Sequence, residues 1–174
     1  AVTVSDADAT AITAAELSDI GSSTTGVVTV TNAVAITGTA AEVTAALVTA
    51  GSLVVVSDAA VTITGNPTIT ELNNIAAKTT GVVTATLAAA SLSDLGSLNT
   101  AATDVITVTV NDADAAAVTA ANLSTLGGKT AGTVTVTNAV AITGSVAEAT
   151  AALVTAGTKV SVSDATVTVT GTPT

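Results

Sequence analysis

Two pairs of carboxylates, each with its members two residues apart, have the spacing best suited to chemistry in this chain. Asp6 pairs with Asp8, and Asp112 pairs with Asp114. Calcium prefers oxygen ligands, and neighbouring segments could add those of Asn32 or Asp58. The spacing fits neither an EF-hand loop nor a glycine-rich Asp nonapeptide. The sequence therefore predicts calcium candidates at Asp6, Asp8, Asp112 and Asp114, and it indicates no other cofactor.

Asp6 and Asp112 also belong to a recurring polar position that has a second interpretation. Asp and Asn side chains at turns commonly bond to nearby backbone amides, and capping of the turn is the default role here. Leu87 interrupts the series. Its polar members are Asp6, Asn32, Asp58, Asp112, Asn138 and Asp164.

Alternating Thr and Ser residues predict a second kind of surface. In each valine-rich segment two polar residues are expected to point outward, and parallel strands about 4.7–4.9 Å apart would align them into two ranks. A flat Thr-x-Thr array resembles the ice-binding face of solenoid antifreeze proteins, although Thr is also an ordinary outward strand residue. The predicted ranks contain Thr3/Ser5, Thr29/Thr31, Val55/Ser57, Thr84/Thr86, Thr109/Asn111, Thr135/Thr137 and Ser161/Ser163.

Catalysis has no identifiable agents in the sequence. The chain contains no His, Cys or Tyr, so no imidazole or thiolate can activate one of its many hydroxyls. A Ser–Lys pair would need Lys78, Lys129 or Lys159, and all three lie in predicted loops. We expect that the protein is not an enzyme. A polysaccharide lyase is a third hypothesis, for which the usual His, Arg, Tyr and Trp are missing.

Composition predicts a thin, regular structure. Hydrophobic residues make up 48% of the 174 residues, and Ala, Val, Leu and Ile supply nearly all of them. These small side chains cannot fill a wide interior. With 13 acidic residues against 3 basic ones, the net charge of −10 argues against nucleic acid and anionic membranes as partners. No run of about 18 apolar residues is present, so no membrane insertion is expected.

Internal repetition is the strongest signal. The segment that ends at Gly51 recurs, nearly unchanged, in the segment that ends at Gly157, an offset of 157 − 51 = 106 residues. We predict one long repeat over 1–106 and a partial second copy over 107–174, with both chain ends expected to be cuts in a longer protein. A shorter period lies inside it, with steps of 26, 26, 29, 25, 26 and 26. These steps separate Val4, Val30, Val56, Ala85, Val110, Val136 and Val162.

Each short period predicts one coil, made of a strand, a polar turn and a short helix. A second alternating stretch, such as 34–36, follows the turn, and it is open whether it forms a second sheet. A capping-box pattern then starts the helix. Gly21, Gly51, Gly127 and Gly157 are expected to stop the helices at the C′ position. The patterns are Thr13-x-x-Glu16, Thr39-x-x-Glu42, Thr68-x-x-Glu71, Ser91-x-x-Asp94, Ser145-x-x-Glu148 and, more weakly, Thr119-x-x-Asn122.

The predicted fold is an α/β solenoid over residues 1–174. It is a right-handed, leucine-rich-repeat-like stack of six to seven coils with a parallel sheet. The alternative is a pure parallel β-solenoid. The irregular coil around Ala85–Asp94 is expected to hold a kink or a specialised contact.

The repeated phrases VTVSDADATAITAAELSDIG and TGVVTVTNAVAITGTAAEVTAALVTAG resemble the giant repeat proteins of marine cyanobacterial cell surfaces and related secreted bacterial adhesin or surface-layer arrays. The resemblance implies an extracellular location at the cell surface and a frequent association with calcium. The expected function is a structural spacer or stalk segment whose partners are neighbouring repeats, with lateral self-association as a further expectation. The alternative is a binding solenoid that uses the Thr-x-Thr or Asp/Asn stripe for ice, glycan or a calcium-mediated partner.

Overall fold

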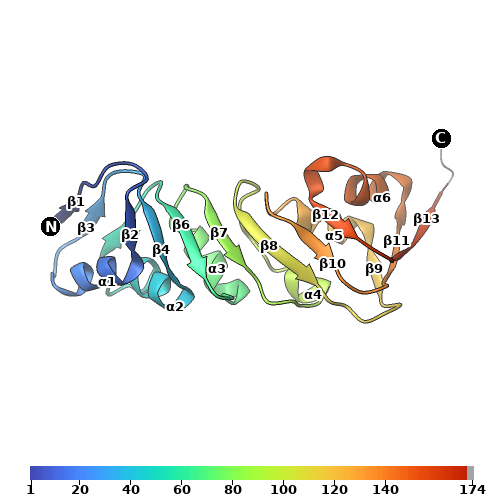
Figure 1. Ribbon diagram of the computed structural model, residues 1–174, viewed down its shortest axis with the longest axis horizontal. Helices are drawn as coiled ribbons and strands as arrows, with labels where there is room; N and C mark the ends of the chain where they lie inside the picture. The colour runs from blue at the N-terminus through green and yellow to red at the C-terminus, as the bar shows by residue number, and fades with distance from the viewer. Residues whose placement is uncertain (172–174) are drawn as a thin grey trace. The chain divides into compact units, whose positions relative to one another are not determined.

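The computed structural model describes residues 1–171 and divides the chain into two compact units. Unit 1 is Ala1–Thr86 and unit 2 is Leu87–Thr174. Each unit is α/β, with parallel sheets and short helices (Figure 1). This agrees with the predicted class, and the helices exclude a purely β structure. The continuous stack over 1–174 stays a prediction, and residues 172–174 lie outside the described part.

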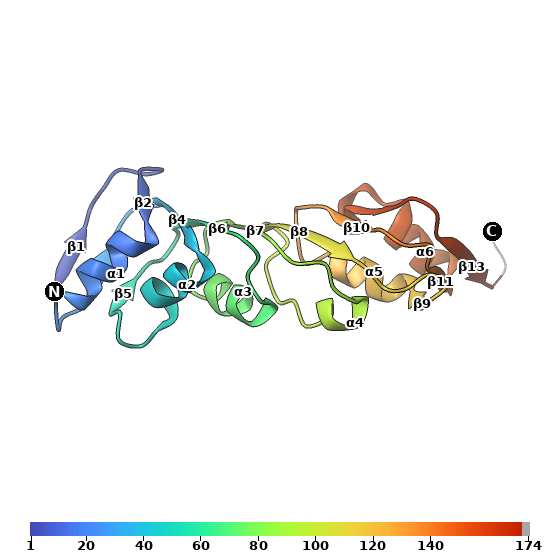
Figure 2. The same cartoon turned by 60° about the horizontal axis from the view of Figure 1, so that its bottom comes forward.

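Unit 1 contains two parallel sheets. One has the order β1-β3-β5, and the other joins β2, β4, β6 and β7 in that order. Helices α1, α2 and α3 lie side by side along the unit (Figure 2). The elements are β1 (Val2–Val4), β2 (Ala11–Thr13), α1 (Ala14–Ser22), β3 (Val28–Val30), β4 (Ala35–Thr39), α2 (Ala40–Val43), the π-helix η1 (Thr44–Val48), β5 (Val54–Val55), β6 (Ala60–Thr64), α3 (Ile69–Ala76) and β7 (Val83–Thr86).

Unit 2 also contains two parallel sheets, with orders β8-β10-β12 and β9-β11-β13. A single bridge between Ala90 and Val110 adds the segment before α4 to the edge of β8. The elements are α4 (Leu92–Leu95), β8 (Val105–Val110), β9 (Ala117–Thr119), α5 (Ala120–Gly127), β10 (Val134–Val136), β11 (Ala141–Ser145), α6 (Val146–Leu153), the 3-10 helix η2 (Ala156–Thr158), β12 (Val160–Val162) and β13 (Thr166–Thr170).

Strand pairing follows the short sequence period. In the first sheet of unit 1, Val28 pairs with both Val2 and Val54, whose numbers differ from its own by 26 in each direction. In its second sheet Ala35 pairs with Ala11 and Ala60, where the differences are 24 and 25. The second alternating stretch, open in the sequence, therefore forms strands that pair with their own equivalents in each unit.

Strand β7 departs from the predicted arrangement. The sequence series places Ala85 after Val56 in the first sheet, but β7 pairs with β6 in the second sheet, through Val61–Val83 and Thr62–Thr84. At Thr39 strand β4 passes directly into α2, whereas Gly65–Thr68 separate β6 from α3. Gly65 has φ +78°, a left-handed turn suited to glycine.

A thin aliphatic core lies between the strands and helices of each unit. Inward strand residues such as Val28 and Ile36 are fully buried, as are Leu17 and Leu72 from the helices. Burial of such a side chain contributes roughly 1.5–3 kcal/mol. Helices this short are unstable alone in water, so packing on the sheets holds them.

None of the four predicted helix stops is a C′ glycine. Gly51 comes three residues after η1 ends at Val48, and Gly157 lies within η2. Gly21 and Gly127 lie within α1 and α5 and are buried, and neither has a positive φ. A Cβ on Gly21 would overlap the Ser52 carbonyl, and one on Gly127 would overlap that of Thr158. These glycines therefore allow a close backbone approach instead of a C′ turn.

Candidate functional site

Four helix starts carry complete capping boxes, as the sequence predicts. At α2 the Thr39 hydroxyl accepts a hydrogen bond from the Glu42 amide at 3.3 Å, and the Glu42 carboxylate accepts from the Thr39 amide at 2.8 Å. The hydrogen bond from the Thr39 backbone amide and, to a lesser extent, that from the Thr39 hydroxyl lower the pKa of Glu42 below its usual value of 4.5. The same causes lower the pKa of Glu16, Glu71 and Glu148. These carboxylates serve as helix caps.

The weaker patterns also start helices. Ser91 accepts a hydrogen bond from the Asp94 amide at 3.1 Å and donates to the Asp94 carboxylate at 2.7 Å. Thr119 accepts from the Asn122 amide at 3.2 Å. Both helix starts are therefore capped by the predicted hydroxyl.

The polar turn residues bond to the backbone of the next predicted coil. In unit 1 the Asn32 amide donates to the Asp6 carbonyl at 2.6 Å, and the Asp8 carboxylate accepts from the Ala33 amide at 3.1 Å. In unit 2 Asn138 donates to the Asp112 carbonyl at 2.7 Å, and Asp114 accepts from the Ala139 amide at 3.1 Å. Such bonds link one coil to the next and match the default role of this position.

The four calcium candidates occupy these turns. Asp8, Asp112 and Asp114 each have one carboxylate oxygen engaged by a backbone amide, that of Leu92 in the case of Asp112, at 2.7 Å. Over residues 1–171 no group of three or more His, Cys, Asp or Glu side chains converges as a metal site. The hydrogen bonds give a structural role to the carboxylates of Asp8, Asp112 and Asp114, and calcium binding stays a prediction.

The predicted Thr and Ser ranks are present only in part. In unit 1 Thr3 pairs with Thr29 and Thr29 with Val55, so an exposed valine interrupts the rank. In unit 2 Thr135 pairs with Thr109 and Ser161, which keeps three polar residues in register. Thr84 belongs to neither rank, because β7 has joined the second sheet.

A second Thr ladder, missed from the sequence, lies on the other sheet of each unit. In unit 1 the register joins Thr13 to Thr37, Thr37 to Thr62 and Thr62 to Thr84. Thr13 and Thr62 are exposed, and the other two are half-buried. Its counterpart in unit 2 runs from Thr119 through Thr143 to Thr168. The alternation of Ile12–Thr13, Ile36–Thr37 and Val61–Thr62 could have indicated it.

Thr130 is a buried polar residue that sequence reasoning also missed. Its hydroxyl accepts hydrogen bonds from the Ile106 and Gly132 amides, both at 2.8 Å. It lies 2.8 Å from the Ile106 carbonyl and 3.0 Å from that of Asp104, to which it can donate. The hydroxyl satisfies backbone groups at the start of β8 and in the turn before β10, so its role is structural.

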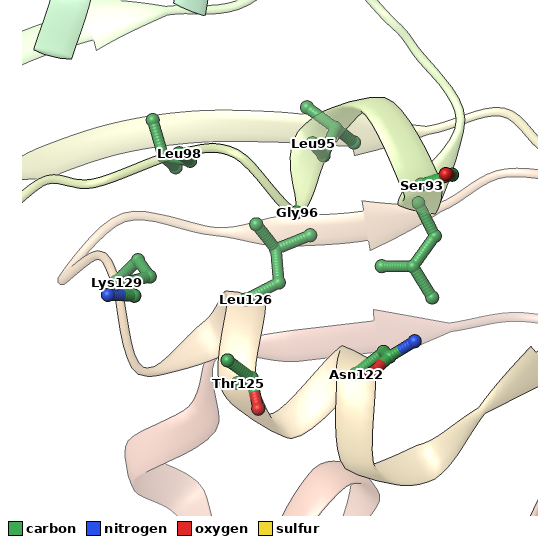
Figure 3. A pocket seen from close by; sticks show the side chains of 9 residues that line it. Ser93, Leu95, Gly96, Leu98, Asn122, Thr125, Leu126 and Lys129 are labelled. Atoms are coloured by element: carbon green, nitrogen blue, oxygen red, sulfur yellow. The ribbon is translucent and has the colours of Figure 1, made fainter.

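A shallow pocket of about 250 Å³ lies between α4 and α5 in unit 2 (Figure 3). Leu92, Leu95, Leu98 and Leu126 provide its apolar wall. Its polar lining is Ser93, Asn122, Thr125 and Lys129, without a carboxylate or imidazole to act as a general base. The other two lysines, Lys78 and Lys159, are exposed. The pocket offers apolar contact and no arrangement suited to catalysis.

None of the helices in the described residues is long and apolar enough to cross a membrane. No protein-family model matches the chain, and no curated protein and no solved structure matches it either.

Proposed function

We propose that this chain is a structural spacer segment, without catalysis, of a very large extracellular bacterial surface or adhesin-type protein. The observation that carries the proposal is the strand register. Val28 pairs with the equivalent residues Val2 and Val54, and Val134 with Val108 and Val160, always one short period away. Because each of these strands pairs with equivalent strands on both sides, the arrangement can be extended by adding further coils.

The proposed mechanism is geometric. The coils stack as a right-handed solenoid, and each adds one strand spacing of about 4.7–4.9 Å to its length. Val and Ile side chains fill the interior, while hydrogen bonds such as that from the Asn32 side-chain amide to the Asp6 carbonyl fix each coil on the preceding one. Capped helices then cover one side. Each of these features favours a stack of coils that is long and stiff.

The composition supports the proposed cell-surface location. The chain has no cysteine, methionine or aromatic residue, so it offers few targets for oxidation. Three lysines and no arginine leave few sites for trypsin-like proteases. An abundant external polymer benefits from both properties.

Concatenated copies of the long repeat, residues 1–106, provide the test. Small-angle scattering and electron microscopy should show particles of constant cross-section. Their length should grow by roughly 20 Å for each repeat of four coils. Antibody labelling of intact source cells should place the protein outside the cell. Globular particles, or a length that does not grow with copy number, would refute the spacer proposal.

An alternative function is binding through the Thr ladder of β2, β4, β6 and β7, favoured by its unbroken register from Thr13 to Thr84. Ice-recrystallisation and glycan-binding assays should then respond to Thr37→Lys together with Thr62→Lys. Thr25→Lys, at an exposed loop residue, is the matched control. Equal behaviour of the three proteins would exclude ladder-mediated binding. Sedimentation of the same variants tests lateral self-association.

A further inference from the structure

The outer edge of unit 1 is an open face formed by β1, β2 and α1. In the described residues β1 is the end strand of its sheet and β2 the end strand of the other. A groove of about 470 Å³ on this face is lined by apolar side chains, including Val4, Ile12 and Ile20, and by Asp6. Val2 and Ile20 remain 37% and 36% exposed. The face thus combines unpaired strand edge with uncovered apolar surface.

Unit 2 contains the same face one long repeat later in the chain, and there it is covered. Val108, the counterpart of Val2, is 0% exposed, and Leu126, the counterpart of Ile20, is 3% exposed. Within unit 2 the segment that lies against this face is Leu87–Asp104, which directly precedes β8 and includes most of the irregular coil. Leu95 and Leu98 from this segment line the pocket above Leu126 (Figure 3). Unit 2 therefore shows which kind of segment can lie on this face.

The covering segment also satisfies the backbone edge. The Leu87 and Ala90 amides donate to the carbonyls of Thr107 and Thr109, at 3.0 and 3.1 Å, and the Asn111 amide donates to the Ala90 carbonyl at 3.0 Å. The unit 1 counterparts of these edge groups are the Ala1 and Thr3 carbonyls and the Ser5 amide.

Two side chains complete the comparison. The Asp112 carboxylate accepts from the Leu92 amide, and the Thr130 hydroxyl bonds to the backbone of Asp104 and Ile106. Their counterparts are Asp6 and Thr24. In the part of the chain that the structure describes, the Thr24 hydroxyl bonds only to the Gly26 amide, at 3.1 Å. The Asp6 carboxylate and the Thr24 hydroxyl can therefore form the same hydrogen bonds with an added coil.

We propose that the face formed by β1, β2 and α1 is a docking site for a coil of the Leu87–Ile106 kind. The occupant is defined by its chemistry: an extended segment whose backbone bonds to β1 as Leu87 and Ala90 bond to β8, a Ser-x-x-Asp capped turn, and leucines at the positions of Leu92, Leu95 and Leu98. The proposal rests on the proposed stacking function and names the partner that continues the stack.

The two faces differ in charge. Glu16 and Asp19 line the groove in unit 1, where Asn122 and Thr125 stand in unit 2. The Glu16 carboxylate is held by its capping box, and both acids are exposed.

The test is a full-length chain with a copy of Leu87–Ile106 fused directly before Ala1, the counterpart of Thr107. Docking should slow hydrogen exchange at the Ser5 amide by at least about tenfold and raise the unfolding midpoint. A matched control carries serine at the three leucine positions of the added copy only. It should leave Ser5 exchange at the level of the parent chain.

Thr24→Val provides a second measurement. It should have a small effect in the parent chain and a larger one in the fused chain, comparable with Thr130→Val. If Ser5 exchange and the Thr24→Val effect are the same in the fused, control and parent chains, the docking proposal is wrong. Length growth of the concatenated repeats would then still test the spacer function separately. A dimer that shows the same protection would support the face, with the copy supplied by a neighbouring molecule.

Discussion

Gly21 lies directly against the backbone of Ser52, where a Cβ would overlap the Ser52 carbonyl oxygen. The nearest side-chain atom to such a Cβ is a methyl of Val54, at 3.2 Å. The helix α1 and the loop before β5 can approach this closely only because residue 21 has no side chain.

Gly21→Ala should therefore destabilise the protein by about 1–3 kcal/mol, as overpacking does. Gly127→Ala should do the same, because its Cβ would meet the Thr158 carbonyl. Gly51→Ala is the control, since nothing lies within 4 Å of its added Cβ, and its effect should stay within about 0.5 kcal/mol. Urea denaturation measures all three. Equal effects at Gly21 and Gly51 would contradict the close approach.

The capping carboxylates predict how stability depends on pH. Hydrogen bonds from Thr13, Thr39, Thr68 and Ser145 lower the pKa of the four capping glutamates below 4.5 in the folded protein. Their contribution is complete above the unfolded value, about 4.5, and is lost as the pH falls through the lowered folded pKa. Denaturation midpoints should therefore decline below about pH 4.5.

Glutamine at these four positions provides the control. Its side-chain oxygen can still accept the N-cap amide but does not titrate. The variant Glu16→Gln, Glu42→Gln, Glu71→Gln and Glu148→Gln should show a shallower decline in acid. An identical pH profile would assign the acid sensitivity to other carboxylates.

Thr130 and Thr24 should respond differently to the same substitution. Thr130→Val leaves the buried Ile106 and Gly132 amides without their shared acceptor, which should cost about 1–3 kcal/mol. Thr24→Val removes a single described bond to Gly26 and should cost less. Thermal melts of the two variants measure the difference. If Thr24→Val lowers the melting temperature as much as Thr130→Val does, the predicted difference between the two residues is wrong.

Calcium should leave the unfolding midpoint unchanged if backbone hydrogen bonds alone hold the polar turns. Asp8 and Asp114 accept amides of the next coil at 3.1 Å, and these bonds need no metal. Melts in calcium and in EDTA make the comparison. A higher midpoint in calcium, removed by Asp8→Asn together with Asp114→Asn, would instead establish the calcium prediction.

Local sequence was sufficient for the features that depend on a few neighbouring residues. The Thr39-x-x-Glu42 cap is defined within a single turn of helix, so it could be predicted. The Val2–Val28 pairing follows from near-identical phrases that repeat at a constant step. The aliphatic alternation likewise predicted that inward strand residues such as Val28 and Val30 are buried.

Features that depend on distant residues could not be predicted. Thr84 pairs with Thr62 of the second sheet, and its local sequence does not distinguish this partner from one in the first sheet. The role of Gly21 depends on the position of the Ser52 backbone, which comes more than a coil later in the chain. Thr130 reaches its partners across 24 and 26 residues. In each case the decisive neighbour is set by tertiary packing.

The sheet change at β7 has a consequence for folding errors. Because Val28 pairs equally well with Val2 and Val54, a strand can replace its neighbour at little energetic cost, and misfolded forms slipped by a whole coil become accessible. The pairing of Val61 with Val83 follows a different and shorter step, and so cannot be reproduced by such a slip. An irregular strand within each long repeat therefore acts as a reference point that distinguishes the native alignment from its near-copies.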